Sequence, residues 1–88
     1  MSKTAPDTDV VIGVDTHKLT HTAVAISAFG VRLGSVTIPA NSTGYQALQA
    51  WAQSLGAIRA FDVEGTGSHG AGLSRFLSEH DWRVFEVN

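Results

Sequence analysis

Apolar residues recur along the chain with two different periods, and these periods predict five strands and two helices. Alternating or continuous β-branched runs predict strands over residues 9–15, 21–27, 31–40, 57–64 and 83–88. Helical spacing joins Tyr45, Leu48, Trp51, Ala52 and Leu55, and later Leu73, Phe76, Leu77 and His80. Helices are therefore predicted over about 41–55, with an N-cap among residues 41–43, and over about 68–80.

The order of these elements, βββαβαβ, predicts a mixed five-stranded sheet of the α/β class. The first three strands follow one another through short connections, including a turn at residues 28–30, and so form an antiparallel meander. A shift of apolar phase at Gly34 predicts a bulge in the third strand. Residues 10–14 are apolar almost without alternation, which is typical of a central strand buried on both faces.

The two strand–helix–strand units constrain where the helices lie. Their crossovers are expected to be right-handed and to move the same way across the sheet, which places both helices on one face. The opposite, apolar face is then left uncovered. An uncovered apolar face indicates a missing element of the fold or a partner, such as a second copy of the chain in a homo-oligomer.

Composition narrows the class of protein. The 88 residues allow one domain, which we place at residues 9–88 behind a polar, disordered leader at 1–8. The formal net charge of −2 argues against a nucleic-acid binder that works by electrostatics alone. Cysteine is absent, which excludes disulfides and thiolate metal sites. We find no signal peptide and no apolar run of about 18 residues, so we expect a cytoplasmic protein without a membrane span.

Two carboxylates stand where strands end. Asp15 ends the first predicted strand and Glu64 ends the fourth, and each precedes a polar or glycine-rich loop. If these strands are parallel neighbours, their carboxyl ends meet at one edge of the sheet, where α/β proteins bind ligands. Two carboxylates held together repel each other unless a cation or a proton lies between them. Oxygen ligands favour Mg²⁺ or Mn²⁺, so a divalent-metal site is predicted here.

The loop that follows Glu64 allows another interpretation. Gly65-x-Gly67-x-x-Gly70, with Glu86 about 20 residues after its first glycine, has the spacing of a dinucleotide-binding fingerprint. Glu64 would place a negative charge beside the pyrophosphate, however, and the fingerprint normally follows the first strand rather than the fourth. We therefore favour a packing role, in which the glycines let the loop and helix approach the sheet closely.

Histidines suggest a further metal, zinc. His17 and His21 are four residues apart, but we expect them in a loop and at the start of a strand, not on one face of a helix. This interpretation is disfavoured.

Two long stretches resemble a known family. GVDTHKLTHTAVAI and DVEGTGSHGAGLSRFLSEHDWRVFEVN are similar to the N-terminal catalytic domain of the insertion sequence 110 transposases, which are DEDD enzymes with a RuvC-like (RNase H-like) domain. The resemblance covers residues 10–88. It implies metal-dependent phosphodiester cleavage and strand transfer on DNA during transposition and recombination, guided by a structured bridge RNA.

The resemblance also assigns roles to residues. Asp15 matches the first catalytic Asp of the family and Glu64 matches its Glu, so both are implied metal ligands. The two remaining Asp of the family lie on a later helical segment, and its catalytic serine lies in another domain; the present sequence reaches neither. We therefore expect a truncated RNase H-like domain that holds Mg²⁺ or Mn²⁺ weakly and is inactive alone.

Nucleic-acid contacts are expected near the same loops. Lys18 follows the Asp15 turn, His69 lies in the glycine loop, and Thr66 and Ser68 precede the second helix, where a helix N-terminus attracts phosphate. Plain N-capping by Ser68 and a solvated Lys18 are the simpler alternatives. Two other functions stay open. One is a non-catalytic dimerisation or regulatory remnant of a transposase, and the other is a nucleotide-binding protein of the actin and sugar-kinase superfold.

Overall fold

The computed structural model describes residues 8–65, 67 and 69–87, and its described elements are those that the pattern predicts. In chain order they are β1 (Asp9–Thr16), β2 (Thr20–Ser27), β3 (Arg32–Pro39), α1 (Ser42–Gln53), β4 (Ala57–Glu64), α2 (Ala71–Glu79) and β5 (Val84–Val87). The predicted leader lies outside the described residues, apart from Thr8. Ser68, the predicted N-cap alternative, also lies outside them. The second helix begins at Ala71, later than predicted, because the glycine loop continues up to its N-cap, Gly70.

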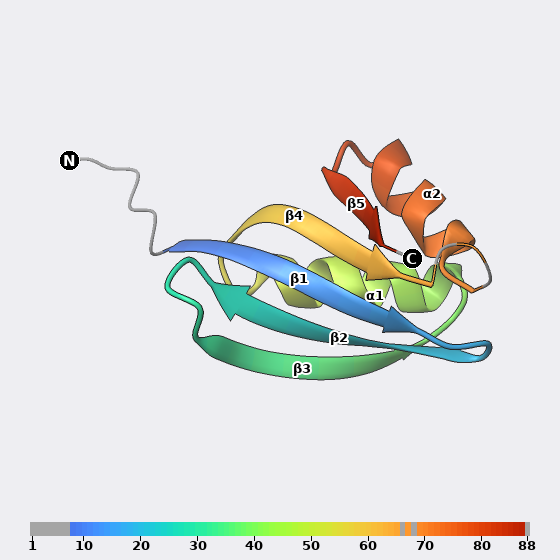
Figure 1. The fold of residues 1–88 in the computed structure, drawn as a ribbon, viewed down its shortest axis with the longest axis horizontal. Helices are drawn as coiled ribbons and strands as arrows, with labels where there is room; N and C mark the ends of the chain where they lie inside the picture. The colour runs from blue at the N-terminus through green and yellow to red at the C-terminus, as the bar shows by residue number, and fades with distance from the viewer. Residues whose placement is uncertain (1–7, 66, 68, 88) are drawn as a thin grey trace.

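One mixed sheet organises the domain (Figure 1). Its strand order is β3-β2-β1-β4-β5, so that β1 is central. β1 and β3 are both antiparallel to β2, whereas β4 runs parallel to β1 and to β5. The predicted mixed sheet of five strands with two helices is therefore confirmed. The bulge near Gly34 is also present, because Ala25 pairs with Gly34 while Ile26 pairs with Arg32.

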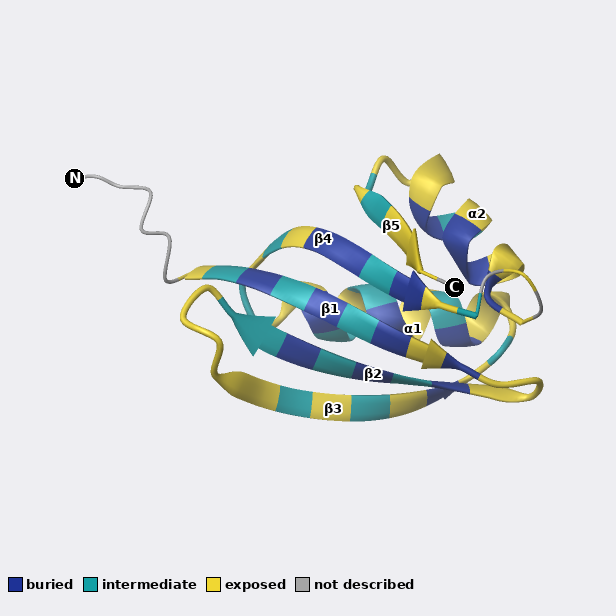
Figure 2. Ribbon diagram, viewed as in Figure 1, coloured by how far each residue is buried: buried dark blue, intermediate teal, exposed yellow. Residues whose placement is uncertain are grey.

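Both helices cover the same face of the sheet, and Figure 1 looks onto the other face, with α1 behind the strands. Along β1 the side chains alternate between buried and more accessible positions (Figure 2). Val10, Ile12 and Val14 point into the core, while Val11 is only half-buried and Asp15 is exposed. The prediction that the first strand is buried on both faces is therefore wrong among the described residues. The reason is physical: two crossovers that move the same way leave no helix for the second face.

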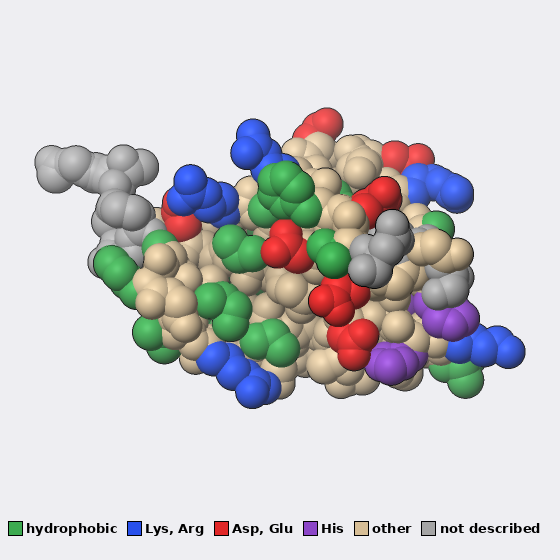
Figure 3. Space-filling view, in the orientation of Figure 1, with side chains coloured by type: hydrophobic (Ala, Val, Ile, Leu, Met, Phe, Trp, Pro, Cys, Tyr) green, Lys and Arg blue, Asp and Glu red, His purple; other side chains and the backbone are tan. Residues whose placement is uncertain are grey.

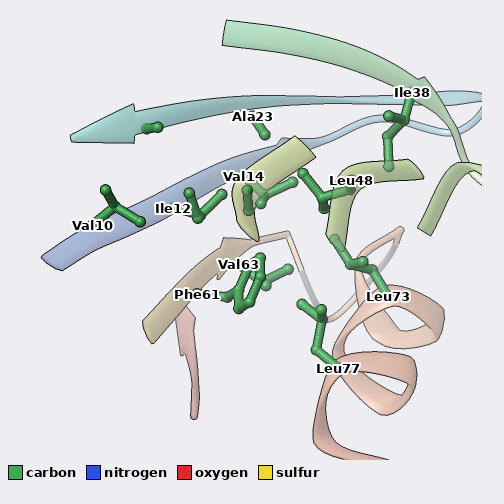
Figure 4. Close-up of a cluster of buried hydrophobic side chains, with 12 residues drawn as sticks. Val10, Ile12, Val14, Ala23, Ile38, Leu48, Phe61, Val63, Leu73 and Leu77 are labelled. Atoms are coloured by element: carbon green, nitrogen blue, oxygen red, sulfur yellow. The ribbon is translucent and has the colours of Figure 1, made fainter. Parts of the chain in front are cut away.

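The core lies between this sheet and the two helices (Figure 4). Phe61 and Val63 from β4 meet Leu48 from α1 and Leu73 and Leu77 from α2, and all five are fully buried. Each such side chain contributes about 1.5–3 kcal/mol when it leaves water. The apolar stripes on the two helices therefore fix the helices to one side of the sheet.

Local contacts hold the helices in place. The predicted N-cap forms at Asn41, whose Oδ1 accepts a hydrogen bond of 2.9 Å from the backbone N–H of Gly44. A Cβ at Gly44 would lie 1.9 Å from the carbonyl oxygen of Pro39, so the first turn of α1 rests directly on the end of β3. At the other end of the chain, Trp82 donates from Nε1 to Oε1 of Gln49 over 2.6 Å. None of the described helices is long and apolar enough to span a membrane.

Candidate metal and nucleic-acid site

Asp15 and Glu64 occupy paired positions on neighbouring parallel strands, β1 and β4. Adjacent strands lie about 4.8 Å apart, so the two carboxylates start from neighbouring backbone positions. Both side chains are exposed on the face that the helices leave open. The structure thus brings together the two residues that the sequence selected as metal ligands.

A bulge in β4 decides which way the carboxylates face. Val10 pairs with Ile58 but Val11 pairs with Ala60, so Arg59 is the extra residue. The shift returns Phe61 to the core side and turns Glu64 to the open side. Bulges often re-aim side chains beside functional sites. If β4 alternated regularly from Ile58, which packs against the core, Glu64 would point towards the helices.

The open face contains a hollow around these carboxylates. Its lining comprises Gly13, Val14, Asp15, Thr22, Val24, Asp62, Glu64 and Val87. Asp62 is a third carboxylate that our sequence interpretation overlooked. The signal was present, because residues two apart in a strand share a face, and Asp62 stands two before Glu64. Figure 3 shows acidic side chains gathered beside apolar ones on this face.

The donor set fits a divalent cation only in part. Asp15 and Glu64 supply the oxygen ligands that Mg²⁺ prefers, and Mg²⁺ characteristically keeps several waters and uses one or two carboxylates. In residues 8–65, 67 and 69–87 no group of three or more His, Asp or Glu side chains is placed to hold a metal. Asp62 therefore adds negative charge to the hollow without completing a three-ligand group.

A histidine stands beside the first carboxylate. His17 Nε2 lies 3.2 Å from Asp15 Oδ2, and both side chains are largely exposed. Within the described part of the chain no ion pair reaches Glu64, which leaves its charge available to a cation. His17 and His21 lie in different environments, since His17 is exposed and His21 is fully buried.

Thr16 and Gly65 fix the loop that follows the carboxylates. Thr16 Oγ1 donates a hydrogen bond of 2.5 Å to the backbone carbonyl of Glu64. Gly65 has φ of 79°, and a Cβ there would lie 2.4 Å from Thr16 Oγ1. Its carbonyl accepts from the N–H groups of His69 and Gly70 at 2.9 and 3.0 Å. Two amides of the loop are thus used internally, which favours the packing role of the glycines over pyrophosphate binding.

The predicted nucleic-acid contacts are placed only in part. Lys18 is exposed in the connection from β1 to β2, and His69 is exposed in the glycine loop. Figure 3 shows histidine and basic side chains at the end of the molecule where β1 turns into β2. Thr66 and Ser68 lie outside the described residues.

His21 is an unusual member of the core. It is 0% exposed, and neither ring nitrogen has a hydrogen-bond partner among the described residues. Its ring stacks on Tyr45 with a centroid distance of 6.0 Å. Burial lowers the pKa of His21 from its usual value, and the nearby His17 and His69 add to this effect.

The fold and the site together define an α/β domain that carries paired carboxylates at the ends of two parallel strands. The family model of the insertion sequence 110 DEDD transposases, described as "Transposase", matches residues 12–88. The chain therefore belongs to this transposase family and corresponds to its N-terminal domain. None of the curated proteins matches the chain.

Proposed function

We propose that this chain acts in DNA transposition and recombination as part of an RNase H-like (RuvC-like) DEDD domain, in which Asp15 and Glu64 hold a divalent cation. The observation that carries the proposal is the pairing of Asp15 with Glu64 across β1 and β4, on the open face of the sheet. Membership of the transposase family supports it. That membership also favours a transposase over a nucleotide-binding protein of the actin and sugar-kinase superfold.

Each residue has a role in this proposal. Asp15 and Glu64 are ligands of Mg²⁺ or Mn²⁺ rather than general bases, because a cation offsets the repulsion of two neighbouring carboxylates. When bound, the cation supplies positive charge that activates a nucleophile and stabilises the leaving oxygen of a phosphodiester. Thr16 keeps the carboxylates in register through its bond to the Glu64 carbonyl. Asp62 increases the negative potential of the hollow.

The site is part of a larger one. Two protein ligands hold Mg²⁺ weakly, so we propose that residues 9–88 form part of the domain and that further carboxylates complete the site. DNA is the proposed substrate and a structured bridge RNA the proposed guide. Lys18 and His69, with Thr66 and Ser68, are the proposed contacts to nucleic acid near the site. Cleavage and strand transfer by residues 1–88 alone are not expected.

Manganese titration tests the proposal directly. Mn²⁺ broadens amide NMR signals close to it, so we expect broadening centred on Asp15 and Glu64. Asp15→Asn and Glu64→Gln should each raise the Mn²⁺ concentration that is needed to broaden these amide signals. Asp62→Asn removes the same unit of charge from the same hollow and is the matched control, with a smaller effect expected. Broadening elsewhere, or an equal effect of Asp62→Asn, would show general attraction of the cation rather than ligation.

A second function has an observation in its favour. The open face exposes large apolar side chains, with Phe85 51% and Val87 42% exposed. An exposed apolar face favours an interaction module, for example a regulatory homo-oligomer. Sedimentation equilibrium distinguishes the two proposals. A stable dimer whose Mn²⁺ broadening is absent from Asp15 and Glu64 would support the regulatory module and contradict the catalytic one.

A further inference from the structure

One polar side chain in the core lacks hydrogen-bond partners. His21, the second residue of β2, is 0% exposed, and neither of its ring nitrogens has a partner among the described residues. A neutral imidazole carries one N–H donor and one acceptor, whereas an imidazolium carries two donors and a charge. Burial without partners is costly for the neutral ring and far more costly for the charged one. The buried position of His21 therefore favours the neutral ring.

Three elements pack against the His21 ring on the helix side of the sheet. His21 pairs with Thr16 of β1 and with Ile38 of β3, and Tyr45 from the first turn of α1 stacks on it. Thr16 and Ile38 carry no titratable group, and Tyr45 contributes only a phenol. None of the three could therefore stabilise an imidazolium by opposite charge.

Two further histidines lie near the ring. His17 follows β1 and His69 lies in the glycine loop, and both are exposed. Together with burial, which has the larger effect, they lower the pKa of His21. Within the described part of the chain no carboxylate bonds the ring, and Asp15 and Glu64 are exposed on the opposite side of the sheet. A proton on His21 is therefore accommodated only when the ring leaves the core.

The ring lies close to the exposed end of a hairpin. Residues 17–19 join β1 to β2, and all three are exposed. In Figure 1 this hairpin end lies at the right-hand edge of the molecule. The N–H of His17 donates to the Thr20 carbonyl over 3.0 Å, and the N–H of Ala40 donates to the Leu19 carbonyl over 2.9 Å. Exposed segments of this kind open locally at less cost than global unfolding.

We propose that His21 is a pH-sensitive switch at this end of the hairpin, and that its protonation releases residues 16–21 from α1 while the rest of the domain stays folded. The fully buried ring lies two residues from the exposed connection, and its stacking on Tyr45 holds the hairpin end against α1. In the open state, water hydrates the imidazolium and bonds both ring nitrogens.

Release of the hairpin end changes the carboxylate site, a consequence that rests on the proposed function of Asp15 and Glu64. Thr16, the partner of His21 across the two strands, donates to the backbone carbonyl of Glu64. When residues 16–21 leave α1, this hydrogen bond breaks, and Asp15 loses its fixed position opposite Glu64. Mildly acidic conditions should therefore weaken cation binding before the domain unfolds.

Amide hydrogen exchange between pH 7 and pH 5 tests the switch. The probe is the Ala40 amide, which is bonded across the hairpin end, and the Phe61 amide, bonded to the Arg83 carbonyl over 2.9 Å in the core, reports global unfolding. Rates are corrected for the intrinsic pH dependence of exchange. Protection of Ala40 should be lower than that of Phe61, and should fall by up to about tenfold per pH unit below 6.5, the ordinary histidine value.

The opposite end of the hairpin provides a matched control amide. The N–H of Ser27, the last residue of β2, donates to the Val31 carbonyl over 2.8 Å. Local opening there leaves His21 buried, so the protection of Ser27 should not change with pH. A protection of Ala40 that equals that of Phe61 at every pH overturns the switch, because the hairpin end would then open only with the whole domain. Equal pH dependence at Ala40 and Ser27 overturns it as well.

Two variants assign the titrating group. His21→Phe retains a ring that stacks on Tyr45 but takes up no proton, so the protection of Ala40 should become independent of pH. His69→Gln removes a nearby exposed histidine and should leave the pH dependence in place; its loss in His69→Gln overturns the switch and assigns the effect to the glycine loop. The comparison of Ala40 with Ser27 in the unaltered chain decides even if His21→Phe does not fold.

EDTA is present in all of these exchange measurements. No cation enters the result, so failure of the switch leaves the Mn²⁺ test of Asp15 and Glu64 unaffected. Absence of Mn²⁺ broadening at those residues likewise leaves the exchange result intact. The two proposals therefore fail or stand separately.

Discussion

The hydroxyl of Thr16 donates a hydrogen bond to the backbone carbonyl of Glu64, and the 2.5 Å contact ties the end of β1 to the end of β4. Thr16 is buried on the helix side of the sheet while the neighbouring Asp15 is exposed on the open side. Asp15 thus presents one candidate ligand, and the next residue, Thr16, fixes the position of the second candidate ligand, Glu64. A Cβ added at Gly65 would clash with the same hydroxyl oxygen.

Thr16→Val removes this hydroxyl with little change of shape. The Glu64 carbonyl then loses its side-chain partner at a partly buried position, so the free energy of unfolding should fall by about 1 kcal/mol. The Mn²⁺ broadening at Asp15 and Glu64 should weaken as well. Urea denaturation measures the first effect, and Thr16→Ser, which retains the donor, is the control. A Thr16→Val variant as stable as the unaltered chain would contradict the assignment.

Gly65→Ala should lower the free energy of unfolding more than an alanine substitution at another turn glycine, Gly30. Gly30 and Gly65 both have positive φ, of 81° and 79°, so alanine at either site costs about 1–2 kcal/mol. Only at Gly65 does the added Cβ meet an atom, Thr16 Oγ1 at 2.4 Å, whereas nothing lies within 4 Å at Gly30. Overpacking adds about 1–3 kcal/mol to the loss for Gly65→Ala. Thermal or urea unfolding of the two variants compares them, and equal losses would refute the close approach.

His21 should make stability depend on pH in the mildly acidic range. Its pKa in the folded chain lies below the unfolded value of 6.5, so the unfolded chain binds the proton more readily. The free energy of unfolding should therefore fall as pH drops below about 6.5, by at most about 1.4 kcal/mol per pH unit for this residue. Above that pH, His21 is neutral in both states and contributes no slope.

Urea unfolding at a series of pH values measures this effect. His21→Leu should flatten the slope, since the buried titrating group is gone. His80→Gln is the control for removing a histidine, because His80 is exposed at the end of α2. His17 and His69 lie near His21 and remain in both variants. An unchanged slope in His21→Leu would assign the pH dependence to other groups.

Ser74 should couple α2 to the strand that carries Phe85. Its buried hydroxyl donates a hydrogen bond of 2.5 Å to Oε2 of Glu86, the neighbour of Phe85 on β5. Ser74→Ala should lower the free energy of unfolding by about 1–3 kcal/mol, because the acceptor is a carboxylate. Ser78→Ala, at an exposed position of the same helix, should have little effect. A double-mutant cycle with Glu86→Gln measures the coupling, and independent effects would argue against it.

Much of the fold could be predicted from local sequence. The strand and helix periods, the Asn41 cap and the turn at Gly30 depend on residues close together in the chain, and all appear at or near their predicted positions. The position of Asp15 and Glu64 at strand ends is equally local. Their metal-binding role stays a prediction.

Long-range features were harder to predict. Asp62 was overlooked, and β1 was expected to be buried on both faces, because a run of apolar residues does not reveal how many layers cover a sheet. The burial of His21 without partners also depends on its contact with Tyr45 from α1. Such features arise between segments that are distant in sequence.

The elements, their order and the type of side chain at each strand end follow from the local sequence, since periodicity and capping act within a few residues. The position of Asp15 opposite Glu64, and the hollow that Arg59, Arg83 and Phe85 line together, arise only when the strands pair and pack. Both depend on the register of β4. A single extra residue at Arg59 sets which side of the sheet every later side chain of that strand faces, and the packing of Phe61 and Val63 into the core fixes that choice.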